Sequence, residues 1–173
     1  MNGARALLDT LVANGVEVCF TNPGTSEMHF VAALDEVPAM RGVLTLFEGV
    51  ATGAADGYGR MAGRPAATLL HLGPGLGNGL ANLHNARRAH TPIVNIVGDH
   101  AVAHQRHDAQ LQSDIATVAR NVSSWIVASS EPAAVATDAA GAVVAATTPP
   151  GAVATLVLPA DVCWGDGADP IGR

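Results

Sequence analysis

Glu48 is the residue whose type and setting first indicate chemistry. It lies in the stretch LFEGVATGAADGYGRMAG at 46–63, where no Lys or Arg follows it until Arg60. An acid at the start of a helix interacts favourably with the helix dipole, which would make Glu48 structural. Burial beside Phe47 and Val50 would instead disfavour the charged form, and a neutral carboxyl group can relay a proton. The residues around Glu48 leave both interpretations open.

Three further segments place Gly and polar side chains directly after apolar, β-branched runs. They are TNPGTSE at 21–27, HLGPGLGN at 71–78 and GDH at 98–100. His71 has two interpretations, a hydrogen-bonded core histidine or a functional group at the end of a strand. Because the carboxyl ends of parallel strands meet at one end of a sheet, we expect these segments to lie beside Glu48.

Two other patterns raise alternative ligands. Alternate glycines between residues 73 and 79 resemble part of a dinucleotide-binding loop, but G-x-G-x-x-G is incomplete and follows the third predicted strand, not the first. A group of polar residues in the segment 99–113 is spaced like one helical face, and a metal site there is an alternative to a polar loop: His100, His104, His107 and Asp108. A nicotinamide cofactor and a metal are therefore secondary hypotheses.

The composition excludes several classes of protein. The chain has 173 residues, of which 49% are apolar and 14% charged, as expected for one globular domain. A net charge of −6 without a basic run argues against nucleic-acid binding. No apolar run approaches the roughly 20 residues of a membrane span, so no membrane contact is expected. Cys19 and Cys163 form no C-x-x-C motif, which favours a reducing, cytoplasmic location.

Strands and helices are expected to alternate along the chain. Apolar, β-branched runs predict strands at 16–20, 42–47, 66–72, 92–98, 123–128 and 152–159. Helical spacing predicts helices at 3–14, 25–37, 48–62, 77–90, 114–120 and 131–147, with GPG at 73–75 breaking the third strand. This alternation is typical of βαβ units. We therefore predict an α/β fold, a doubly wound three-layer sandwich around a six-stranded, mostly parallel sheet.

Four segments in this order and spacing resemble those of a known family: NPGTSE at 22–27, FEGVATGAADGYGRMAG at 47–63, HLGPGLGN at 71–78 and PIVNIVGDH at 92–100. The chain resembles the N-terminal, pyrimidine-binding domain of thiamine-diphosphate-dependent enzymes, in the acetolactate synthase and benzoylformate decarboxylase group. The resemblance runs from about residue 3 to residue 170. It implies a pyrimidine-binding domain at 1–160 and the start of an interdomain linker at 161–173.

The resemblance assigns roles around the cofactor. Glu48 corresponds to the glutamate that hydrogen-bonds the aminopyrimidine ring nitrogen of thiamine diphosphate and so promotes loss of the thiazolium C2 proton. A carboxyl group held away from bulk water suits this role. Gly75 and Asn78 correspond to the segment lying against the pyrimidine. Pro23 and Gly24 belong to the turn nearest the substrate.

The residues expected near the substrate resemble two different branches of the family. Thr25 falls where the decarboxylases place a substrate-contacting serine, and it keeps the hydroxyl. His71 matches the active-site histidine of the decarboxylases. The GPG at 73–75 and LQSDIATVAR at 111–120 are instead similar to the synthases. An acetolactate-synthase-like carboligase or decarboxylase acting on a 2-oxo acid is the function that we expect.

A second domain is implied for the other half of the cofactor. In the family, the diphosphate and its Mg²⁺ bind a separate domain through G-D-G followed downstream by Asn. Gly165-Asp166-Gly167 resembles the start of that motif, but only six residues follow it. The resemblance therefore implies a diphosphate-binding domain, in the same or another chain, and a homodimer or homotetramer. FAD is a further candidate cofactor of a full-length protein.

Two alternatives to this reading stay open. A short subunit of a two-subunit decarboxylase, of the sulfopyruvate or phosphonopyruvate type, would carry the same domain. A non-catalytic binding module that retains the fold would also fit the chain.

Overall fold

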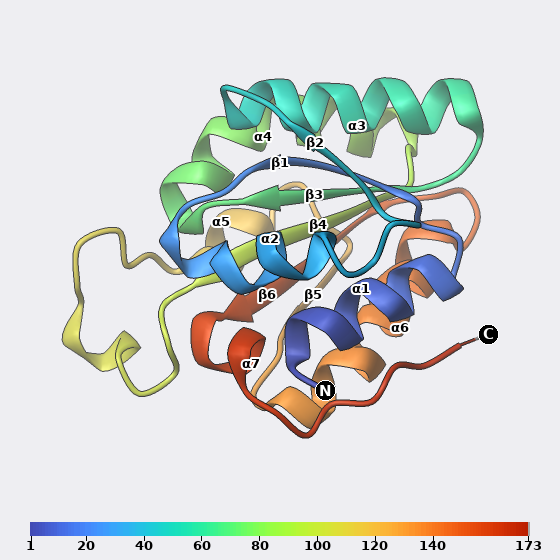
Figure 1. The fold of residues 1–173 in the computed structure, drawn as a ribbon. Coiled ribbons are helices and arrows are strands. Elements are labelled where there is room, and N and C mark those ends of the chain that lie inside the picture. The colour runs from blue at the N-terminus through green and yellow to red at the C-terminus, as the bar shows by residue number, and fades with distance from the viewer. Residues whose placement is uncertain (173) are drawn as a thin grey trace.

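The central sheet has six strands, and every neighbouring pair of strands is parallel. The structure, a computed structural model, describes residues 1–172. The order across the sheet is β2-β1-β3-β4-β6-β5 (Figure 1). The strands are β1 (Val18–Asn22), β2 (Arg41–Leu44), β3 (Ala66–Leu70), β4 (Ile93–Asp99), β5 (Trp125–Ala128) and β6 (Val153–Pro159).

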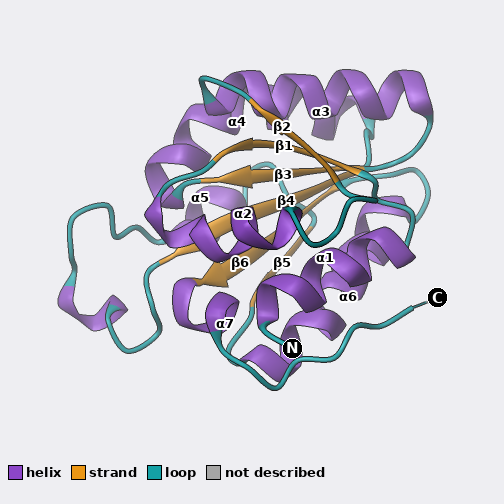
Figure 2. Cartoon of the chain, in the orientation of Figure 1, coloured by secondary structure: helices purple, strands orange, loops and turns teal. Residues whose placement is uncertain are grey.

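Helices cover both faces of the sheet (Figure 2). One face carries α3 (Glu48–Ala62), α4 (Leu72–Ala89) and α5 (Ile115–Ala119). The other carries α1 (Gly3–Ala13), α2 (Met28–Leu34), α6 (Val135–Thr147) and α7 (Ala160–Trp164). Short 3₁₀ turns are η1 (Thr25–Glu27), η2 (Gln105–His107) and η3 (Pro132–Ala134). The predicted doubly wound, three-layer α/β sandwich is confirmed.

The middle strands are apolar because both of their faces are covered. Every residue of β3, β4 and β6 is buried. Their polar side chains bond to each other across the sheet: Thr68 Oγ1 donates to Asn95 Oδ1 at 2.8 Å, and Asn95 Nδ2 donates to Thr155 Oγ1 at 2.9 Å. These three residues are direct partners in the strand register, so the core contains a hydrogen-bonded polar row.

Several predicted boundaries differ from the structure, and two of the differences change the kind of element. GPG at 73–75 does not form a loop, because α4 begins at Leu72 and includes these residues in its first turn. Proline is tolerated there, since the first N–H groups of a helix have no partner inside the helix. The helix predicted at 25–37 is instead the turn η1 followed by α2, which ends at Leu34 before Pro38.

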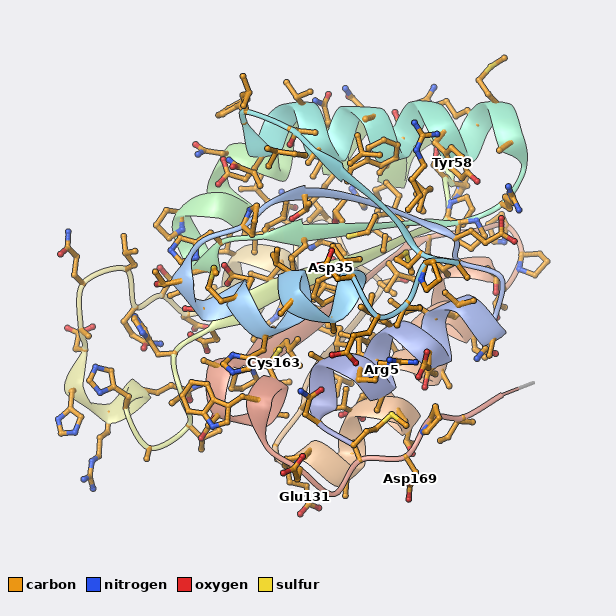
Figure 3. All side chains as sticks on the ribbon, viewed as in Figure 1. Arg5, Asp35, Tyr58, Glu131, Cys163 and Asp169 are labelled. Carbon is orange, nitrogen blue, oxygen red and sulfur yellow. The ribbon has the colours of Figure 1, made fainter. Side chains whose placement is uncertain are left out.

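Residues after β6 pack against the beginning of the chain. Gly3 N donates to Gly165 O at 3.0 Å, and the backbones of Asn2 and Asp166 form an isolated antiparallel β-bridge. Cys163, labelled in Figure 3, and Ala168 are both buried. The assignment of 161–173 to an interdomain linker stays a prediction, although its first part lies on the domain.

The segment between β4 and α5 projects from the body of the molecule, in yellow tones in Figure 1. It contains η2 and is otherwise irregular, as predicted for 99–113. None of the helices in the described chain combines the length and the apolar character that crossing a membrane requires.

Candidate functional site

The site lies where the strand order changes direction. The chain places β2 on one side of β1 and β3 on the other, and the helices after β1 and β3 cover opposite faces. Ligands of open α/β sheets bind in the crevice beyond the carboxyl ends of the strands at such a point. We call this part of the molecule the carboxyl end of the sheet; the arrowheads of the strands mark it in Figure 1.

Glu48 begins α3 directly after the segment that follows β2. The residue is buried, with 8% of its surface exposed. Its Oε2 accepts a hydrogen bond from Asn78 Nδ2 at 3.0 Å. Asn78 lies in the second turn of α4, so the bond joins two helices on the same face of the sheet. The structure therefore brings together two residues that lie 30 positions apart in the sequence.

Gly75 provides the space that the Glu48 carboxyl group occupies. A Cβ atom at position 75 would lie 3.1 Å from Glu48 Oε1 and 3.4 Å from the backbone carbon of Leu70. The first approach is tighter than ordinary van der Waals contact, so a Cβ at position 75 would require the Glu48 carboxyl group to shift. Gly75, Asn78 and Glu48, all expected at the cofactor, therefore form one group.

The shielding of Glu48 differs from the expectation. In one of the two interpretations of the sequence, Phe47, Val50 and neighbouring small residues bury the carboxyl group, but Phe47 and Val50 are exposed, at 48% and 55%. Residues from α4 shield Glu48 instead. Leu44 and Leu46 are also exposed, at 68% and 92%, so an apolar surface surrounds the start of α3.

His71 precedes α4 and lies one helical turn from Gly75, whose N–H donates to His71 O at 2.8 Å. The imidazole is 24% exposed, and its Nδ1 lies 2.8 Å from Glu27 Oε2. When Glu27 is ionised, Nδ1–H donates a hydrogen bond to its Oε2, and Nε2 is then the unprotonated nitrogen of a neutral ring. His71 is therefore neither a core histidine nor fully solvated.

Glu27 is the site residue that the sequence analysis missed. It ends η1, is 2% exposed, and its Oε2 also accepts from Gly24 N at 2.7 Å. Its Oε1 is buried without a hydrogen-bond partner among the described residues, next to Gly98. Glu27 is the last residue of NPGTSE, four residues after the turn proline. Nothing in the sequence distinguishes a buried glutamate at this position from an exposed acid at the start of a helix.

The surroundings of Glu27 shift its protonation. Burial raises the pKa of the carboxyl group, and this effect exceeds the opposing effects of the Gly24 N–H and of His71. A buried acid with a raised pKa next to a half-buried histidine is typical of sites that move protons.

The turn at 22–25 meets this pair. Gly24 lies directly against the His71 imidazole, so closely that a Cβ there would overlap the ring. Pro23 is half-buried, and Thr25 is exposed at the start of η1. The turn is thus beside His71, as expected.

The polar segment after β4 forms a separate group. Asp99 accepts hydrogen bonds from His100 N at 2.8 Å and from Gln105 Nε2 at 2.9 Å, and burial raises its pKa. The rings of His100, His104 and His107 lie 5.6 Å and 5.4 Å apart in sequence order. Within residues 1–172, no three His, Cys, Asp or Glu side chains are placed to hold a metal ion. The alternative of a metal site at these histidines therefore gains no support.

The fold and these groups together define a cofactor-binding α/β domain with two acids at the carboxyl end of its sheet. The family profile described as "Thiamine pyrophosphate enzyme, N-terminal TPP binding domain" matches residues 1–119. The chain belongs to this family of thiamine-diphosphate enzymes, as the N-terminal domain.

Individual relatives agree with this assignment. A Mycobacterium tuberculosis (strain H37Rv) protein, named as a candidate acetolactate synthase large subunit, IlvX, is 68% identical over 168 residues, covering 97% of this chain and 32% of that protein. Benzoylformate decarboxylase of Pseudomonas aeruginosa is 39% identical over 93 residues, covering 54% of this chain and 17% of that protein. The chain thus spans at most about a third of the length of these relatives.

A solved structure matches nearly the whole chain. The Rhodococcus jostii RHA1 thiamine diphosphate-dependent 4-hydroxybenzoylformate decarboxylase superimposes with a TM-score of 0.91 at 25% identity. The match covers 98% of this chain and 32% of that one. The described fold is therefore that of one domain of a larger enzyme of this family.

Proposed function

We propose that this chain is the pyrimidine-binding part of an acetolactate-synthase-like, thiamine-diphosphate-dependent enzyme acting on 2-oxo acids, and that Glu48 activates the cofactor. The observation that carries the proposal is the setting of Glu48, a buried carboxyl group at the carboxyl end of the sheet, held by Asn78 and given space by Gly75. The family assignment supports thiamine diphosphate as the cofactor.

The residues fit one end of that cofactor. Glu48 Oε2 is engaged by Asn78, whereas Oε1 makes no hydrogen bond among the described residues. Oε1 can therefore bond a ring nitrogen of the aminopyrimidine, and the Asn78 amide fixes the orientation of the carboxyl group. When bound, thiamine diphosphate supplies a carbanion-stabilising thiazolium ring. Glu48 holds or moves a proton at the pyrimidine nitrogen, and its burial strengthens that interaction because water is excluded.

His71 and Thr25 face the substrate side in this proposal. With Nδ1 bonded to Glu27, the outer His71 Nε2 is free to exchange a proton with a bound 2-oxo acid or its product. The exposed Thr25 hydroxyl, in the neighbouring turn, can bond the substrate carboxylate. Pro23 and Gly24 shape the turn that brings both groups together.

The test of the cofactor role is Glu48→Gln in the complete natural protein that contains this chain. Exchange of the thiamine diphosphate C2 proton, followed by NMR, should slow by roughly 100-fold or more, since positioned proton transfer contributes about 10²–10⁴-fold. Glu131→Gln, at an exposed glutamate labelled in Figure 3, is the matched control and should exchange normally. Undiminished exchange in Glu48→Gln would exclude the role of Glu48 and favour a non-catalytic module.

A decarboxylase is the second candidate, and the Glu27–His71 pair favours it because His71 matches the histidine of that branch. The two activities differ in their products. Incubation of the complete protein with pyruvate should yield a carboligation product if it is synthase-like. Release of benzaldehyde from benzoylformate, without carboligation, would favour the decarboxylase.

The proposal also requires a partner domain. The diphosphate and Mg²⁺ are assigned to a diphosphate-binding domain of the same or another chain, and any FAD to a further domain. The exposed apolar surface of Leu44, Leu46, Phe47 and Val50 beside Glu48 supports coverage of this region by that partner in a homodimer or homotetramer. A two-subunit decarboxylase would cover it with a different chain. A cytoplasmic location fits the two free, buried cysteines.

A further inference from the structure

The amino end of the sheet, opposite Glu48 and His71, contains a hollow of about 540 Å³. It lies between the C-terminal end of α4, the residues before β5 and the segment that leads from α6 into β6. This volume lies in the range of small-molecule sites, about 300–1,000 Å³. The hollow shares no residue with the proposed cofactor site.

One side of the hollow is cationic. Arg87 and Arg88, from the last turn of α4, and His90 line it, and no Asp or Glu does. Within residues 1–172, neither of the two arginines forms an ion pair with a carboxylate. Two of the nine basic residues of a chain with net charge −6 thus line this hollow without a carboxylate partner within residues 1–172.

The other described arginines are divided. Arg5, Arg60 and Arg64 each bond a carboxylate at 2.7–2.9 Å, whereas Arg41, Arg106 and Arg120, like Arg87 and Arg88, form no ion pair with a carboxylate within residues 1–172. Basic residues at a helix C-terminus also interact favourably with the helix dipole, which accounts for the position of Arg87 and Arg88 along α4. The dipole does not account for the hollow beside them.

Much of the remaining lining of the hollow is apolar. Val122 and Val153 are buried, and Ala145 and Pro150 also line the hollow, together with three hydroxyl side chains: Ser123, Ser124 and Thr148. Guanidinium groups recognise carboxylates and phosphates through paired hydrogen bonds, whereas the apolar wall suits a short hydrocarbon body. The hollow therefore offers both halves of a site for an amphipathic acid.

We propose that this hollow binds a small organic anion, with its carboxylate or phosphate on Arg87 and Arg88 and its apolar body against Val122 and Val153. The proposal does not depend on the function proposed for Glu48. Such a site lies at the opposite end of the sheet from Glu48 and His71.

Three probes separate the contributions of charge and apolar body. Isovalerate carries both, isovaleramide lacks the charge, and inorganic phosphate lacks the apolar body. Equilibrium dialysis or saturation-transfer NMR with the complete natural protein should show isovalerate binding, and at least tenfold weaker binding of isovaleramide. Phosphate binding weaker than that of isovalerate fits a site for organic carboxylates, and the reverse order fits a site for organic phosphates.

Variants locate the binding. Arg87→Gln combined with Arg88→Gln should weaken isovalerate binding at least tenfold, while circular dichroism and the unfolding midpoint stay unchanged. Arg106→Gln, at an exposed arginine in the projecting segment, changes the net charge without touching the hollow and should bind normally. Equal weakening by Arg106→Gln, binding that survives the double substitution, or no binding of any probe at about 10 mM, above the millimolar range of weak sites, would each overturn the proposal.

Discussion

Glu48 and Glu27, two acids at the carboxyl end of the sheet, are held in different ways. Glu48 begins a helix, bonds one amide, and keeps an oxygen free for a ligand. Glu27 is more deeply buried, and its single bonded oxygen accepts from both Gly24 N and His71 Nδ1, while the other is enclosed. One oxygen of Glu48 has no hydrogen-bond partner within residues 1–172, whereas the bonded oxygen of Glu27 accepts only from protein groups.

We expect the two acids to contribute differently to the stability of the fold. Removing Glu48 deletes one hydrogen bond to an exposed amide, so the fold should tolerate the change. Removing Glu27 leaves two donors near the protein interior without their acceptor, which costs stability. The contrast can be tested by changes at each acid and at His71, which bonds Glu27 and which we propose faces the substrate.

The largest expected effect is on turnover, at His71. His71→Asn retains an N–H donor toward Glu27 but lacks the outer ring nitrogen. Turnover of the complete protein should fall by about 100-fold, within the range of positioned proton transfer, while the stability stays close to normal. C2 proton exchange of the cofactor should also persist, because Glu48 is intact. Normal turnover in His71→Asn would show that Nε2 moves no proton.

A smaller effect is expected on stability. Glu27→Ala should lower the free energy of unfolding by about 2 kcal/mol, because the Gly24 N–H and the His71 Nδ1–H lose their acceptor. Glu48→Ala should lower it by only about 0.5–1 kcal/mol, the value of one partly exposed hydrogen bond and a helix-end charge. Urea unfolding of both variants measures the difference. Equal losses would contradict the division of roles.

The smallest effect is on the pH dependence of stability. Burial raises the pKa of Glu27, so the folded protein binds this proton more tightly than the unfolded chain does. The resulting stability is fully present below the ordinary glutamate pKa and is lost as the pH rises through the raised value. Glu27→Gln removes this titration and should flatten the curve in that window.

Unfolding midpoints of the wild type and Glu27→Gln across about pH 4 to pH 8 measure this contribution. Burial raises the pKa of Asp99 too, but Asp99 is present in both proteins and cancels in their difference. Parallel curves would mean that Glu27 keeps an ordinary pKa in the folded protein.

The sheet and the place of the site were predictable from the sequence. Nearly continuous apolar runs such as IVNIV indicate strands buried on both faces. Because the carboxyl ends of parallel strands meet at one end of a sheet, the strand positions also placed Glu48, His71 and the 22–25 turn at that end, where they lie in the structure. Local patterns suffice here because strand burial and helix alternation are themselves local in sequence.

Other features depend on contacts that a local pattern does not contain. Glu27 is distinguished by Gly24, His71 and Gly98, which come from three separate segments. The glycines at 73 and 75 predicted a loop, but they lie in the first turn of α4, where a Cβ atom would meet Ser113 at position 73 and Glu48 at position 75. The pair Arg87 and Arg88 gave no signal, because the hollow beside them is formed by residues more than 30 positions later.

The polar row of Thr68, Asn95 and Thr155 has a consequence for assembly of the sheet. If β4 slid by one residue against its neighbours, the Asn95 amide would turn to the other face and meet hydrocarbon, and both hydrogen bonds would break. The hydrogen-bonded row therefore favours a single register of β3, β4 and β6. It also fixes the relative position of the strand ends: Leu70, the residue before His71, pairs with Val97, two residues before β4 ends at Asp99.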